Sequence, residues 1–286
     1  MTRMEEFRQQ MAARMSALRA GETDVYGRTA GSLSAKENAA AQAAAYLTPT
    51  LEEFQQWWDA VRGSMHVRMN ERYNASASRV KLQYLSDDDQ VNAFAAQGQG
   101  GDGYLIAFYG GAVRFSRLAS LAVAVDICGR PGTASRFAKT IDNGGLMSRQ
   151  TALDIMADCG LDEAFSLPGV QTKAQAVSAG MIIGVLAHEM GHVCLGHVDG
   201  PSYYDSNPEI ARNHEREADS FASSITAATP FGEYVYDGTL FWHYVLAQQQ
   251  GNTAIESTHP LERERLENLI RANPSKASAL GIGMPR

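Results

Sequence analysis

Apolar side chains near the start of the chain recur every three or four residues, which is the spacing of an amphipathic helix. In one segment they form a largely aromatic stripe made of Phe54, Trp57, Trp58, Val61 and Met65. Thr50 and Glu53 stand just before the stripe with the spacing of a capping box, and Pro49 precedes them. We therefore expect a helix that begins near Thr50 and packs this stripe in the core. Another helix is predicted over residues 1–20, followed by a linker over 21–35.

The next part of the chain carries the pattern of strands. Residues 80–85 alternate apolar and polar side chains, as a half-buried strand does, and 91–95 and 104–109 are short strand-like segments. A glycine-rich segment over 98–103 separates the last two. Because a strand rather than a helix follows it, we expect a hairpin turn there and not a phosphate-binding loop.

Helical spacing returns in the second half of the chain. Residues 112–128 and 148–158 are predicted helices, and another helical pattern starts at Lys173. The segment 129–172 mixes loop signals with helical ones. The pattern as a whole predicts an α+β fold that is mostly helical and contains a small sheet. We expect an N-terminal helical region over 1–78 and a second domain over 79–286.

Charge and cysteine content indicate which partners and which cellular compartment fit the protein. The chain of 286 residues has 25 basic and 32 acidic side chains, a net charge of −7, which argues against a nucleic-acid partner. Three widely spaced cysteines form no disulfide framework and indicate a reducing compartment. No apolar segment reaches the roughly 18–20 residues of a membrane span, and the first residues lack a secretory pattern. We expect a cytoplasmic protein without an integral membrane segment.

The chemistry is concentrated in one motif, H-E-x-x-H, formed by His188, Glu189 and His192. Residues four apart on a helix share a face, so both imidazoles can reach one zinc ion. Glu189 lies beside them, where it can take a proton from a zinc-activated water. Zinc is inferred from the types of ligand, and a different divalent ion is compatible with them.

The third ligand decides the class of metal site. His197 stands five residues after the second histidine, whereas a metzincin requires six, so that class is excluded. Glu215 and Asp219 lie four apart in a later helical segment, so Glu215 can bind the metal while Asp219 accepts the outer N–H of a ligand histidine. Glu217 is the fallback third ligand, although we expect it to be a solvated charge. His197 and His214 are interpreted as surface or cleft histidines.

These motifs resemble a known family. H-E-x-x-H followed by E-x-x-A-D is similar to the zinc metallopeptidases related to the CaaX prenyl protease and HtpX, within the gluzincins. Val91–Ala95 resembles the N-A-F-A segment of that family, and 258–265 resembles its late T-H-P-x-x-x-x-R segment. The resemblance implies a gluzincin fold with one zinc ion per chain. It implies the zinc ligands His188, His192 and Glu215, the catalytic base Glu189, an orienting Asp219, and His259 and Arg265 near substrate or oxyanion.

The chain departs from that family in three ways, one of which is the short spacing from His192 to Glu215. In addition, it lacks the transmembrane helices, and about 90 residues separate the N-A-F-A segment from the metal motif. The insertion near 129–172 is a candidate lid or partner surface. The helix after H-E-x-x-H also resembles that of ImmA/IrrE-type regulatory proteases, which remain a rival family.

The sequence thus predicts a zinc endopeptidase whose small sheet, beside the motif helix, binds an extended peptide along its edge strand. The alternative is a zinc-containing protein-binding or chaperone-like module in which peptidase activity is latent or absent. A structural zinc site fits less well, since such sites are usually closed by four Cys or His ligands.

Overall fold

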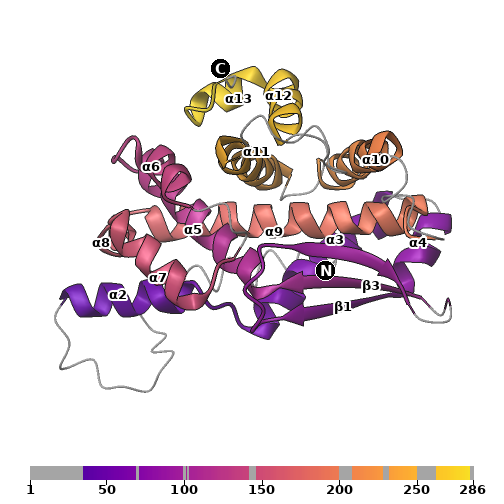
Figure 1. Cartoon of the computed structure of the whole chain (residues 1–286), viewed down its shortest axis with the longest axis horizontal. Helices are drawn as coiled ribbons and strands as arrows, with labels where there is room; N and C mark the ends of the chain where they lie inside the picture. Colours follow the sequence, from indigo (N-terminus) through magenta and orange to yellow (C-terminus); the bar gives the residue numbers. More distant parts are fainter. Residues whose placement is uncertain are drawn as a thin grey trace.

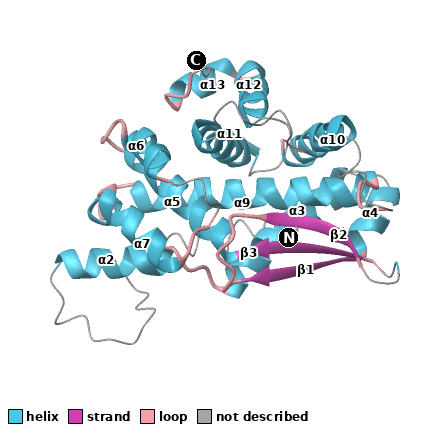
Figure 2. Ribbon diagram, viewed as in Figure 1, coloured by secondary structure: helices cyan, strands magenta, loops and turns pink. Residues whose placement is uncertain are grey.

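The computed structural model describes residues 35–68, 71–98, 101, 103–141, 146–199, 208–227, 232–249 and 262–283. Over these ranges the protein is mostly helical and holds one three-stranded sheet (Figures 1 and 2). The predicted mostly helical α+β class is therefore confirmed, while the helix predicted over 1–20 lies outside the described residues. The helices are α2 (Ala35–Tyr46), α3 (Leu51–Arg68), α4 (Glu71–Ser78), α5 (Gly110–Ile127), α6 (Thr133–Thr140), α7 (Arg149–Asp158), α8 (Leu161–Ala164), α9 (Val170–Leu195), α10 (Pro208–Thr226), α11 (Gly232–Gln249), α12 (Glu262–Ala272) and α13 (Pro274–Ala279).

The sheet contains β1 (Val80–Leu85), β2 (Ala93–Gln97) and β3 (Tyr104–Tyr109), in the order β1-β3-β2. The central strand β3 runs parallel to β1 and antiparallel to β2, so β2 stands at an edge. The backbone N–H of Gly98 donates to the carbonyl of Gly103 at 2.8 Å, which closes the predicted hairpin. The first and third strands match their predicted positions, whereas the second lies two residues later than predicted.

Helix α9 is at the centre of the fold, because α5, α10 and α11 all pack against it (Figure 1). Strands β2 and β3 also contact it, so the small sheet lies beside the motif helix as predicted. Among the described helices, α9 alone has the length and composition to cross a membrane, but 83% of its apolar window is buried inside the structure. A central helix of a globular domain has the same properties, so the expected absence of a membrane segment stays a prediction.

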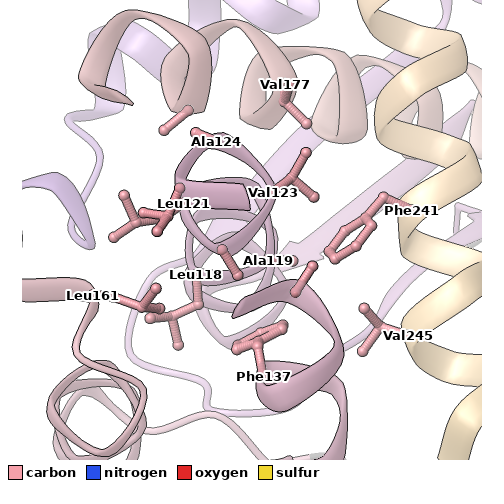
Figure 3. Packing of buried hydrophobic residues seen from close by; sticks show 14 of the residues in the cluster. Leu118, Ala119, Leu121, Val123, Ala124, Phe137, Leu161, Val177, Phe241 and Val245 are labelled. Atoms are coloured by element: carbon pink, nitrogen blue, oxygen red, sulfur yellow. The ribbon is translucent and has the colours of Figure 1, made fainter. Parts of the chain in front are cut away.

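The larger hydrophobic core surrounds α5 (Figure 3). Leu118 and Leu121 of α5 are fully buried, and Phe137, Leu161 and Phe241 pack in the same cluster from three other helices. Much of the described part of 129–172 therefore forms core structure. Its helices α6 and α8 were not predicted, because short helices leave too few residues to show a period.

The second core lies between α3, the sheet and the C-terminal half of α9. The predicted stripe of α3 is buried there, and the Phe54 ring stacks on Tyr84 of β1 with centroids 4.4 Å apart. The Glu53 backbone N–H donates to the Thr50 hydroxyl at 3.1 Å, and Thr50 N–H donates to the Glu53 carboxylate at 2.9 Å. The predicted capping box is thus confirmed, and the division of the chain at residue 78 stays a prediction.

Two glycines allow α9 and α11 to approach closely. A Cβ built on Gly180 would lie 2.0 Å from the Tyr234 carbonyl oxygen, and one on Gly238 would lie 2.5 Å from the Met181 nitrogen. No side chain fits at either position without moving a helix backbone. The close contact fixes the part of α11 that lies over the metal motif helix.

We expect Gly180→Ala to destabilise the fold by roughly 1–3 kcal/mol, because the added methyl group forces the two helices apart. Gly63→Ala is the matched control, since Gly63 is also helical but a Cβ there would meet no other atom within 4 Å. That change should be neutral or stabilise by up to about 1 kcal/mol. Urea unfolding of both variants measures the difference, and equal midpoints would contradict the close packing.

Candidate metal centre

The two histidines of the motif lie one turn apart near the C-terminal end of α9. Their Nε2 atoms face each other at 3.1 Å, and their ring centroids are 4.8 Å apart. His192 is only 5% exposed and the neighbouring Glu189 is 8% exposed. The buried α9 therefore holds both imidazoles rigidly toward one point, as the four-residue spacing predicts.

Glu215 of α10 completes the cluster. One carboxylate oxygen lies 3.2 Å from Nε2 of His188, and the other lies 3.6 Å from Nε2 of His192. The ligand atoms of the three residues all lie within 4.8 Å of one another, so this cluster can hold a metal ion. The approach of α10 depends on Gly191, where a Cβ would come within 3.1 Å of the Ala218 Cα.

Asp219 lies one turn beyond Glu215 and contacts the other side of the His188 ring. Its Oδ1 is 2.8 Å from Nδ1 of His188. Arg265 of α12 donates to both oxygens of the same carboxylate, at 2.6 and 2.9 Å. The predicted orienting contact of Asp219 is therefore present, and the arginine fixes the carboxylate in place.

Burial and hydrogen bonding set the charges of this cluster. Burial disfavours a charged His188, but its hydrogen bonds with Asp219 and Glu215 outweigh burial and raise its pKa to about 10. Burial and the neighbouring His188 lower the pKa of His192 to about 3. Burial opposes ionisation of Asp219, yet Arg265 and His188 hold its pKa well below the usual range. Metal binding requires unprotonated imidazole nitrogens, so an ion bound by this pair would compete with protons for them.

The sequence did not predict a second series of contacts, which begins at the outer ring nitrogen of His192. The Nδ1 atom of His192 lies 3.1 Å from Nδ1 of His197, and Nε2 of His197 lies 3.0 Å from the Glu217 carboxylate. The His197 side chain is only 4% exposed, so it is not the surface histidine that was expected, although it stands outside the cluster of candidate ligands, as the sequence predicts. Glu217 is 61% exposed, as expected of a solvated charge, and its carboxylate also accepts a hydrogen bond from this ring. The signal that could have found the contact is Gly196, a helix stop that turns the chain back over the last turn.

A cavity of about 760 Å³ opens over the ligand atoms. Its walls come from edge strand β2 and from α9, α10, α11 and α12, and the catalytic candidates Glu189 and Arg265 both line it. His243 of α11 also lines it, a buried histidine that sequence reasoning did not identify. The described part of 129–172 contributes no lining residue. His259 lies outside the described residues, so its predicted role stays a prediction.

Comparisons with protein families, curated proteins and solved structures find no match. The functional interpretation therefore depends on the geometry of the cluster and on the motifs that form it.

We expect Asp219→Asn to weaken metal binding by about 10–100-fold, because the amide replaces the carboxylate that holds His188. Competition with a fluorescent chelator measures the affinity. Asp158→Asn, an exposed change on α7 away from the cluster, serves as the control and should leave the affinity unaltered. Identical affinities for the two variants would show that Asp219 does not orient the ligand.

Proposed function

We propose that this protein is a zinc-dependent endopeptidase of gluzincin type. The observation that carries the proposal is the convergence of His188, His192 and Glu215 within 4.8 Å, with Glu189 on the same helix. The likeness of the motifs to CaaX prenyl protease and HtpX relatives supports the same function. In this proposal the three residues are the resident zinc ligands.

The donor set fits zinc. Two imidazole nitrogens and one carboxylate are one of the ligand sets found in catalytic zinc sites, which keep a further coordination position for water or substrate. Bound zinc supplies Lewis-acid chemistry, polarising the scissile carbonyl and lowering the pKa of a water molecule. The three described cysteines, Cys128, Cys159 and Cys194, are not members of the cluster, so it lacks the thiolates of a closed structural site.

Glu189 is the proton carrier of the proposed reaction. It is buried and lines the cavity next to the ligand histidines. Its carboxylate takes a proton from the water that attacks the peptide carbonyl and passes it to the amine as the C–N bond breaks. Each turnover consumes one water and yields one carboxylate and one amine, so the glutamate returns to its starting form.

The edge strand β2 is the proposed binding site for the peptide. Within the described residues β2 pairs only with β3, and Ala93, Phe94 and Ala95 line the cavity. An extended peptide can add to the outer edge of β2 by main-chain hydrogen bonds and pass over the metal cluster. Arg265 is held by Asp219, so orienting the ligand system is the role its contacts support. Its part in oxyanion stabilisation remains a prediction.

The test measures both the zinc content and the peptidase activity of each variant. Wild type should bind about one zinc per chain and cleave casein, while Glu189→Gln should retain zinc and lose about 10²–10⁴-fold in rate, because the amide accepts no proton. Elemental analysis and a casein assay on the same samples give both quantities. Glu215→Ala should lose zinc and activity together.

Two outcomes would contradict the proposal. Activity retained by Glu189→Gln would remove the assigned base, and a wild type without zinc would remove the metal site. Zinc bound without cleavage of any unfolded protein would favour the binding or chaperone-like module.

A further inference from the structure

The two ligand histidines have different partners on their outer nitrogens. Nδ1 of His188 faces Asp219, a carboxylate fixed by Arg265. Nδ1 of His192 faces Nδ1 of another imidazole, that of His197, at 3.1 Å. A metal-binding histidine commonly donates its outer N–H to an acceptor that fixes the ring. His197 stands at that place for His192.

The end of α9 puts His197 there. Gly196 has φ +79°, which reverses the chain at the helix end, and the His197 backbone N–H donates to the His192 carbonyl at 2.9 Å. This is the glycine-terminated turn that folds a chain back over the last helical turn. The His197 backbone is therefore tied to the residue whose side chain it contacts.

Helix α10 holds the His197 ring from the opposite side. The ring stacks on His214, with centroids 4.1 Å apart and planes within 6°. Its Nε2 lies 3.0 Å from Glu217. Both partners flank the metal-ligand candidate Glu215 in the sequence. The same helix thus supplies a ligand to the cluster and the groups that fix His197.

One arrangement of protons satisfies these contacts when His192 binds a metal through Nε2. The proton of His192 then lies on Nδ1 and is donated to Nδ1 of His197. His197 must be neutral, with its own proton on Nε2, which donates to Glu217. Neither nitrogen of His197 is left to face the ligand atoms, so His197 is not a further ligand.

We propose that His197 is a positioning residue that fixes the tautomer and orientation of the metal-ligand His192, and that Glu217 fixes His197 in turn. This inference rests on the proposed zinc site. In this centre the fixed carboxylate of Asp219 orients one ligand, His188. The neutral imidazole of His197 orients the other ligand, His192, and is itself hydrogen-bonded to Glu217, whose side chain is 61% exposed.

The test compares two variants of similar shape. His197→Leu removes the acceptor, whereas His197→Asn can place an amide oxygen near the former Nδ1. Both variants lose the ring stacking and the contact with Glu217. A difference in zinc affinity between them therefore measures the hydrogen bond to His192. Zinc affinity, measured by chelator competition, should fall about 10–100-fold in His197→Leu and recover substantially in His197→Asn.

Substitution of zinc by cobalt gives a visible absorption spectrum that a change in packing alone would not alter. The visible d–d bands of the Co²⁺-loaded protein should change in His197→Leu and return toward the wild-type spectrum in His197→Asn. Equal losses in both variants, or wild-type affinity in both, would overturn the inference. A wild type that binds neither ion would overturn the proposed function itself and the inference with it.

Glu217→Ala decides the matter if His197→Leu does not fold, because it removes the acceptor of the His197 ring and, since Glu217 is exposed, leaves the core intact. We expect weaker zinc binding than in wild type. Glu209→Ala is the control, since Glu209 is an exposed glutamate on the same helix and pairs with Arg212. An equal effect of the two changes would mean a general charge effect and would overturn the role of Glu217.

Discussion

The burial of His192 and Glu215 where α9 meets α10, with His188 and Asp219 half-buried beside them, is the constraint on which the rest of the site depends. Such groups are costly in an apolar interior unless each has a partner. The fold meets this requirement by pairing them with one another and with a cation. His188 and Glu215 lie within hydrogen-bonding distance, and Asp219 is held by two bonds from Arg265. The same pairings turn the nitrogen lone pairs and carboxylate oxygens toward one point.

The packing around α9 makes this arrangement possible. Gly191 lets α10 approach on one side, and Gly180 lets α11 approach on another, while α12 brings Arg265 onto Asp219. The large core around α5 anchors the opposite half of α9 (Figure 1). A rigid helix with its ligands buried at one end leaves little freedom for the imidazoles, which is what a binding site for a small ion requires.

Sequence reasoning identified the centre of the site better than its surroundings. His188 and His192 follow from helical spacing alone, and Glu215 and Asp219 from the same spacing one helix later. Helix α2 was missed because its alanine-rich sequence has no contrast between apolar and polar positions. The contact between His197 and Glu217 was missed because it depends on two features: the turn at Gly196, which the sequence signals only as a helix end, and the packing of α10, which has no signature in one sequence. The partner of Arg265 needed the tertiary structure for the same reason.

X-ray absorption at the zinc edge of the zinc-loaded protein tests the central claim most directly. We expect a four-coordinate ion with two imidazole nitrogens and a carboxylate oxygen at roughly 2.0–2.2 Å. The spectrum should contain no sulfur at about 2.3 Å. A sulfur shell, or an ion without imidazole ligands, would contradict a centre formed by His188, His192 and Glu215.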